Sequence, residues 1–213
     1  MNMKVTLAMI IIAVTVFGMT AAMDDKEAFM NSYGFSGESL AAKPYTIITS
    51  VFVHSSIAHL LANILAWLFF GYAVEKELGA AKMLAIFFIG AAAGDFLSLL
   101  FYPAGTVGIG ASAGIFALVG AGMLVRPLDL SFYPVVVPVP LIFLGLAYAL
   151  YNAYEFFFAF DPTVSYAGHF GGLLIGLAFG FRHTDMKKGL LTMTIALGIM
   201  ILIPLLWMVI MSG

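Results

Sequence analysis

The sequence contains no cysteine and few charged residues. Without cysteine, the chain has no disulfide, no thiolate nucleophile and no cysteine-ligated metal site. Charged residues make up 9% of its 213 residues, whereas soluble domains carry about 25%, so most of its surface does not face water. The net charge of −2 provides no basic surface for nucleic acid. The lack of cysteine excludes thiol enzymes, the small net charge gives no indication of a nucleic-acid partner, and the low charge content favours a membrane protein.

Apolar residues make up 63% of the chain and gather into seven segments. Most of these segments have about the ~20 residues that a helix needs to cross a ~30 Å hydrocarbon core. They are residues 4–22, 55–74, 82–102, 112–126, 134–158, 167–182 and 189–211. Because no backbone group is left unpaired in lipid, these runs predict an all-α polytopic membrane protein. The first run has the length of a retained spanning helix rather than of a cleaved signal peptide.

Lysine and arginine predict the orientation, because they are enriched on the cytoplasmic side of membranes. If the N-terminus is cytoplasmic, seven of the nine basic residues fall on that side: Lys4, Lys76, Lys82, Arg126, Arg182, Lys187 and Lys188. Lys26 and Lys43 fall outside, in the one long hydrophilic stretch between the first two segments. We therefore expect a multi-pass protein of the cell membrane with its C-terminus outside.

Three unusual polar residues lie at one predicted depth. They are Asn63, Ser112 and His169, which precede Lys76, Arg126 and Arg182 by 13, 14 and 13 residues. At 1.5 Å per residue, each lies roughly 20 Å from the cytoplasmic boundary, with His59 one turn from Asn63 on the same helix face. Taken singly, each residue is more often a packing or hydrogen-bonding residue of a membrane helix. Together at one level, they predict a functional site.

This set of residues can support acyl transfer. The hydroxyl of Ser112 is a poor nucleophile until a base removes its proton, and apolar surroundings keep His169 in the neutral form that a base needs. The developing oxyanion needs donors, which we assign to the backbone N–H of Ser112, the amide of Asn63 and the imidazole of His59. Gly110 and Gly114 are expected to leave room for a substrate backbone. No carboxylate is placed to orient His169, so the prediction is a Ser-His dyad.

Other hydrolase chemistries fit less well. The G-x-S-x-G of "GASAG" requires a preceding strand and a soluble α/β sheet, which the composition excludes. No H-E-x-x-H zinc motif is present. Gly94-Asp95 is reminiscent of intramembrane aspartyl proteases, but Asp95 has no acidic partner at matching depth, so a hydrogen-bonded structural role is favoured for it.

Three motifs in order resemble the rhomboid family of intramembrane serine proteases. "HSSIAHLLAN" carries His54, His59 and Asn63 in the family's H-x4-H-x3-N spacing. "GASAG" matches its G-x-S-x motif at Ser112, and "AGHFGGLLIGLAFG" supplies His169, Gly172 and Gly176. The segments "PYTIITSVFVH" and "GYAVEKELGAAK" are also similar, and the resemblance covers residues 1 to about 182.

The resemblance implies a six-helix catalytic core in residues 1–182, followed by a basic linker and one extra helix in residues 183–213. It implies a Ser112–His169 dyad that cleaves transmembrane segments of other proteins in the lipid bilayer, with no metal or cofactor. The sequence carries no indication of oligomeric state. Gly172, Gly176 and Gly180 share one helix face, which predicts close packing against the fourth helix. Phe116 stands where relatives often have a tyrosine, and the first outer loop lacks their Trp-Arg pair.

Alternatives to a protease remain. A catalytically silent relative that binds or escorts membrane proteins would not need the intact Ser112 and His169, and a channel or transporter would need more buried charges. For substrate access, residues 101–111 are expected to dip into the protein. The aromatic run at residues 154–162, "YEFFFAFDP", is either a mobile gate or a lipid-facing aromatic belt.

Overall fold

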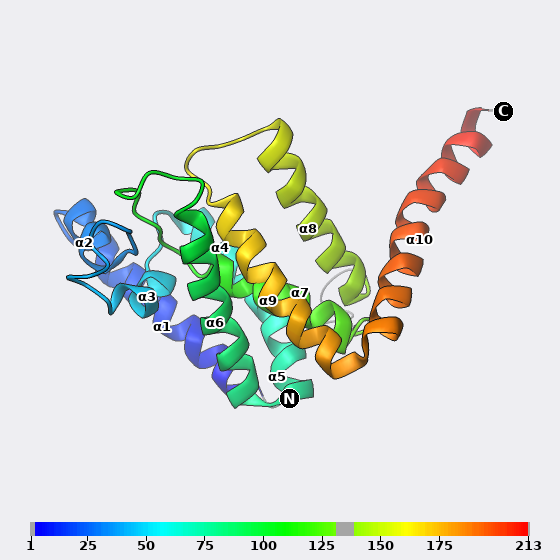
Figure 1. Ribbon diagram of the computed structural model, residues 1–213, viewed down its shortest axis with the longest axis horizontal. Coiled ribbons are helices and arrows are strands. Elements are labelled where there is room, and N and C mark those ends of the chain that lie inside the picture. Colours follow the sequence, from blue (N-terminus) through cyan, green and yellow to red (C-terminus); the bar gives the residue numbers. More distant parts are fainter. Residues whose placement is uncertain (1–2, 131–138, 213) are drawn as a thin grey trace.

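The described residues form a bundle of helices (Figure 1). The computed structural model describes residues 3–130 and 139–212. The helices are α1 (Lys4–Ala21), α2 (Lys26–Tyr33), α3 (Thr46–Thr49), η1 (Ser50–Phe52), α4 (Ile57–Ala66), the π-helical η2 (Trp67–Gly71), α5 (Tyr72–Leu78), α6 (Ala80–Ser98), α7 (Ser112–Val125), α8 (Leu141–Phe158), α9 (Tyr166–Thr184) and α10 (Met186–Ser212). In these ranges the only β-type pairing is an isolated bridge between Phe35 and Gly108.

The all-α prediction is confirmed. Five stretches have the length and composition to cross a membrane: α1, the continuous run Ile57–Leu78, α6, α8 and α10. Helix α7 is apolar but has 14 residues, and α9 has 19 residues whose glycines, histidines and arginine lower its hydropathy. The fifth predicted segment begins at residue 134, and residues 131–138 lie outside the described part of the chain. Helix α8 begins at Leu141.

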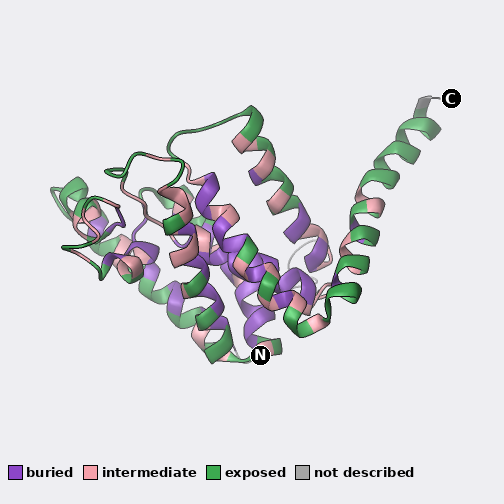
Figure 2. Ribbon diagram, viewed as in Figure 1, coloured by how far each residue is buried: buried purple, intermediate pink, exposed green. Residues whose placement is uncertain are grey.

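Helix α7 is the centre of the bundle. Every residue from Gly114 to Leu124 is buried, because α7 packs against α6, α8, α9 and η2 on different sides. Figure 2 shows this buried centre and the mostly exposed residues along α10. A helix that is apolar all round and buried all round needs no polar face, which explains why the sequence of α7 shows no amphipathic pattern.

Glycines on α9 let its backbone lie against that of α7. A side chain at Gly172 would overlap the carbonyl oxygen of Ala113, and one at Gly176 would overlap the carbonyl oxygen of Ala117. The predicted neighbour of the glycine face is therefore confirmed. Small residues allow this approach, and the close packing gives the dispersion contacts that hold helices together in lipid.

The loop between α1 and α4 is held to the segment before α7 by backbone pairing. Phe35 and Gly108 exchange two hydrogen bonds of 2.9 and 2.7 Å, and the N–H of Glu38 donates to the carbonyl of Ala104. Further along, the N–H of Gly110 donates to the carbonyl of Ser50 at 2.9 Å. These bonds supply an anchor in a loop that has no Trp-Arg pair. Residues 103–106 are exposed, whereas residues 107–110 are half-buried, so this segment descends toward α7.

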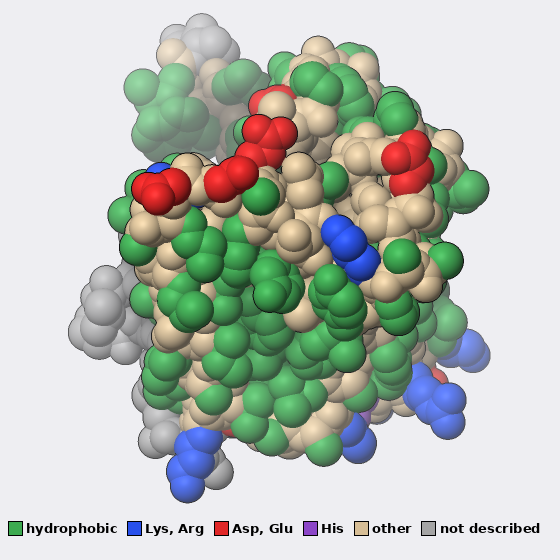
Figure 3. Space-filling model, turned by 90° about the vertical axis from the view of Figure 1, so that its left-hand side faces the viewer, with side chains coloured by type: hydrophobic (Ala, Val, Ile, Leu, Met, Phe, Trp, Pro, Cys, Tyr) green, Lys and Arg blue, Asp and Glu red, His purple; other side chains and the backbone are tan. Residues whose placement is uncertain are grey.

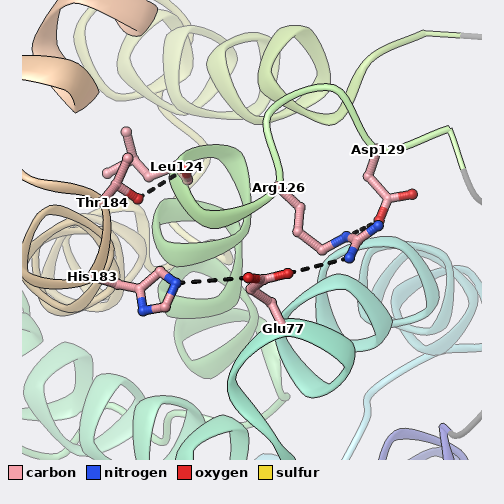
Figure 4. A network of polar contacts seen from close by, with 6 residues as sticks. All are labelled: Glu77, Leu124, Arg126, Asp129, His183 and Thr184. Carbon is pink, nitrogen blue, oxygen red and sulfur yellow. Dashed lines mark hydrogen bonds and ion pairs between the residues drawn. The ribbon is translucent and has the colours of Figure 1, made fainter.

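Polar contacts tie the helices together at the end of the bundle where α5, α7 and α9 finish. Glu75 is buried and accepts hydrogen bonds from the backbone N–H of Val5 and Thr6 and from the Thr6 hydroxyl, so it caps the start of α1. Figure 4 shows a second group, in which Glu77 pairs with Arg126 at 3.3 Å and faces His183 at 3.8 Å. These contacts fix the ends of three helices relative to one another.

The surface has the charge pattern of a protein that spans a membrane. Figure 3 shows a broad apolar band across the middle of one face, with acidic side chains gathered at one end and most lysines and arginines at the other. Helix α10 extends away from the bundle beyond its first turns (Figure 1), and its side chains are mostly exposed and apolar. In water this surface would be unstable, so it faces lipid.

We predict that Gly176→Ala lowers stability and separates α7 from α9. Its methyl group overlaps the Ala117 carbonyl oxygen, and overpacking of this kind costs about 1–3 kcal/mol. Gly198→Ala on α10 is the matched control, because no atom lies within 4 Å of its added methyl group. Thermal unfolding in detergent measures both variants. Equal melting temperatures would contradict the close packing of α7 and α9.

Candidate active site

Ser112 and His169 meet where α7 begins. Ser112 is the first residue of α7, and His169 lies on α9, one turn before Gly172. The Nε2 atom of His169 lies 2.8 Å from the Oγ atom of Ser112. Because Gly172 packs on the Ala113 carbonyl, the glycine face of α9 sets this distance. The two side chains are 57 residues apart in sequence.

The imidazole of His169 is held on two sides. Its plane stacks on the ring of Phe116, with centroids 4.4 Å apart and an interplanar angle of 8°. Tyr166 meets it edge-on at 6.3 Å. The stack forms without a tyrosine hydroxyl, so Phe116 supplies the flat apolar wall and no hydrogen bond.

Asn152 on α8 is a site residue that the sequence analysis missed. Its side chain is 3% exposed, and its Oδ1 atom lies 2.7 Å from Nδ1 of His169. Its Nδ2 atom donates to the backbone carbonyl of Tyr166 at 3.3 Å. The available signal was a lone amide inside an apolar segment, which is costly in lipid unless it is paired.

Asn63 and His59 both lie beside Gly110, which is two residues before Ser112. Gly110 has a φ of 106°, a conformation that favours glycine. A Cβ atom there would lie 2.5 Å from Nε2 of His59 and 3.7 Å from Nδ2 of Asn63. Asn63 is buried, and its Nδ2 has no hydrogen-bond partner within the described ranges. An unpaired buried donor is costly, so Nδ2 of Asn63 is free to meet an acceptor that the described residues do not supply.

His54 supports His59 rather than joining the dyad. Its ring meets that of His59 edge-on with centroids 5.0 Å apart, and its Nδ1 lies 3.2 Å from the carbonyl oxygen of Phe52. Burial, with a smaller contribution from His59, lowers the pKa of His54 to about 4. His54 is therefore neutral at pH 7 and adds no charge beside His59.

Two residues differ from expectation. Gly114 does not open space for a substrate, because a side chain there would lie 2.6 Å from the ring of Phe87 on α6. Its missing side chain makes room for that ring. Asp95 was expected to be hydrogen-bonded, but its buried Oδ2 has no partner in the part of the chain that the structure describes. The carboxylate of Glu155 on α8 accepts a hydrogen bond from the hydroxyl of Tyr166 at 3.3 Å.

The aromatic run at the end of α8 has an inner and an outer side. Phe156 packs edge-on against Phe101 and against Phe170 of α9, with centroids 5.9 and 5.8 Å apart. Phe157 and Phe158 are 68% and 78% exposed. The run therefore has both the inward contacts that a gate needs and the outward rings that an aromatic belt needs.

We predict that Gly110→Ala impairs the site more than the fold. The positive φ strains an alanine by about 1–3 kcal/mol, and its methyl group displaces the His59 ring. Gly18→Ala is the control, since its methyl group meets no atom within 4 Å. Thermal unfolding and covalent labelling by a fluorophosphonate measure fold and site separately. Unchanged labelling of Gly110→Ala would show that His59 does not need its present position.

Comparison with known proteins gives one family. The family model described as "Rhomboid domain" matches residues 41–186, a range that contains all the site residues above. The chain is 28% identical to "Rhomboid-like protease 3" of Toxoplasma gondii over 144 residues, which are 63% of this chain and 49% of the relative. It is 30% identical to "Rhomboid protease GlpG" of Salmonella paratyphi A over 136 residues, which are 64% and 47% of the two chains.

The chain thus spans about half the length of these curated relatives. A shorter match to "RHOMBOID-like protein 1" of Arabidopsis thaliana is 35% identical over 77 residues, which are 36% of this chain and 20% of the relative. The matched range ends at residue 186, where α10 begins. Since the family model covers more than half of the chain, this protein belongs to the rhomboid family.

Proposed function

We propose that this protein is an intramembrane serine protease that hydrolyses peptide bonds in or near transmembrane segments of other membrane proteins. The observation that carries the proposal is the 2.8 Å distance between Ser112 Oγ and His169 Nε2 inside an apolar bundle. A half-buried serine hydroxyl beside an imidazole is the arrangement that acyl transfer requires. The family membership supports the same reaction class.

In this mechanism His169 takes the proton of Ser112 as the hydroxyl attacks the substrate carbonyl carbon. The negative charge that develops on the carbonyl oxygen is stabilised by Nδ2 of Asn63, Nε2–H of His59 and the backbone N–H of Ser112. The C–N bond then breaks, and His169 gives its proton to the leaving amine. Water attacks the acyl-enzyme by the same route, with His169 again as base.

Removing one oxyanion donor in a protease of known mechanism costs roughly 10²–10³ in rate, so these donors matter as much as the base. Asn63 suits this role because its Nδ2 is unpaired within the described residues. It therefore breaks no existing hydrogen bond when it donates to the substrate oxygen.

The orientation of the protein in the bilayer and the division of the chain after residue 182 are also proposals. The positions of the basic residues support a cytoplasmic N-terminus and an outside C-terminus, which puts the dyad nearer the outer leaflet. We assign catalysis to residues 1–182 and an anchoring role to residues 183–213, since α10 extends from the bundle and carries none of the site residues. A substrate reaches the dyad laterally if the end of α8 moves.

We predict that a fluorophosphonate labels the detergent-purified protein at Ser112. Ser112→Ala is expected to lose labelling, and His169→Ala is expected to label at least 10²-fold more slowly because the base is gone. Ser98→Ala is the control: its hydroxyl lies 2.6 Å from that of Ser165 and donates to the carbonyl of Gly94, and within the described residues it has no hydrogen bond to Ser112 or His169. Equal labelling of the wild type and Ser112→Ala would reject the protease and leave the silent relative as the better reading.

We predict that proteolysis falls as the pH is lowered. A protonated His169 has no lone pair on Nε2 and cannot accept the proton of Ser112, so the rate is highest when the ring is neutral and declines in acid. Initial cleavage rates of a transmembrane substrate across the pH range measure this, with thermal stability recorded at each pH to separate unfolding. A rate that stays flat into acid would argue against His169 as base.

A further inference from the structure

Asn152 is buried on a helix whose neighbouring positions are exposed. Leu150 and Tyr151 are 50% and 65% exposed, whereas Asn152 is 3% exposed and faces α9. An amide in apolar surroundings is costly unless both of its ends are paired. Both ends of Asn152 are paired, and both partners lie on α9. Asn152 therefore links α8 to α9 through two hydrogen bonds, one to His169 itself and one to the backbone three residues before it.

The orientation of the Asn152 amide follows from its partner at Tyr166. A backbone carbonyl only accepts hydrogen bonds, so the atom of Asn152 that faces the Tyr166 carbonyl must be the amide nitrogen. The opposite orientation would place two acceptor oxygens against each other. The amide oxygen is consequently the atom that lies 2.7 Å from Nδ1 of His169.

The amide oxygen in turn determines where His169 carries its proton. An amide oxygen accepts and cannot donate, so Nδ1 of His169 must be the N–H that donates to it. In a neutral imidazole the other nitrogen then has a free lone pair. That nitrogen, Nε2, is the one 2.8 Å from Ser112 Oγ. This tautomer can accept the serine proton, and the other tautomer cannot.

The remaining contacts of His169 do not make this choice. The Phe116 ring fixes the plane of the imidazole, and Tyr166 contacts it through the ring edge, but neither ring supplies an acceptor to Nδ1. An uncharged amide is also less costly to bury in the bilayer than a carboxylate would be. Asn152 thus supplies the orientation that an aspartate supplies in soluble serine proteases, without the charge.

We propose that Asn152 is a positioning residue that completes a Ser112–His169–Asn152 triad by holding His169 in the Nδ1–H tautomer. This inference rests on the proposed protease function. Because Asn152 lies on α8 and His169 on α9, the base is correctly oriented only while α8 is packed against α9. If α8 moves away, the hydrogen bond from Nδ1 of His169 to Asn152 is lost and the Nδ1–H tautomer is no longer favoured. The position of α8 thus controls whether His169 can act as the base for Ser112.

Two variants test this. Asn152→Leu has a similar size and no hydrogen bonds, and Asn152→Asp keeps an acceptor for Nδ1. Leu150→Ala is the control on the exposed side of α8. For Asn152→Leu, kcat against a transmembrane substrate is expected to fall about 10- to 10³-fold with a small change in KM, since an orienting residue acts on the chemical step. Thermal stability shows that each variant is folded.

The direct readout is the protonation of the His169 ring, from nitrogen NMR of protein labelled with ¹⁵N-histidine. The chain has four histidines, and His169→Ala identifies the signals of His169. The wild type and Asn152→Asp are expected to show a protonated Nδ1 and an unprotonated Nε2, whereas Asn152→Leu shows a mixture of tautomers. An unchanged tautomer in Asn152→Leu overturns the proposal, whatever happens to kcat, and so does a mixture in Asn152→Asp.

The two proposals fail in different ways. If the wild type is not labelled by a fluorophosphonate, the protease function fails, but the NMR measurement still reports whether Asn152 sets the tautomer. If labelling depends on Ser112 while Asn152→Leu keeps both the kcat of the wild type and its His169 tautomer, the protease function stands and the positioning role of Asn152 is rejected.

Discussion

The close approach of the α7 and α9 backbones is the constraint on which the rest of the site depends. Gly172 and Gly176 lie against the carbonyl oxygens of Ala113 and Ala117, where no side chain fits. Ser112 begins α7 just before this contact, and His169 precedes it on α9. The distance between serine and imidazole is therefore a consequence of helix packing. In lipid, where no hydrophobic effect drives helices together, such small-residue contacts also provide the stability.

The same bundle solves the problem of keeping polar groups in an apolar interior. Glu75 is buried, but three donors from the start of α1 satisfy it. His169 is satisfied by Ser112 and Asn152, and Asn152 by Tyr166. Not every buried polar atom is satisfied: Nδ2 of Asn63, Nε2 of His54 and Oδ2 of Asp95 have no partner in the described ranges. Among these atoms, Nδ2 of Asn63 beside Gly110 is the one to which the proposed mechanism assigns the substrate oxygen.

Much of this arrangement was predictable. The apolar runs predicted the helices, because a segment in lipid must satisfy its own backbone. The small residues on one face of α9 predicted its neighbour. The spacing from basic residues predicted that Ser112, His169, Asn63 and His59 lie at one depth. The role of Asn152 could not be predicted in this way, because it lies on a helix without a matching motif. Its local sequence does not indicate which side of α8 faces α9.

Gly114 shows the complementary limit, since a glycine beside a candidate nucleophile suggests open space but here admits the ring of Phe87. The amino-acid sequence alone determined the helical architecture, the family and the candidate site residues, because hydrocarbon length, backbone pairing and short motifs are local properties. The tertiary structure alone decided which amide contacts His169 and which donor is left unpaired. Those are contacts between helices, and they depend on rotations about helix axes that no local pattern specifies.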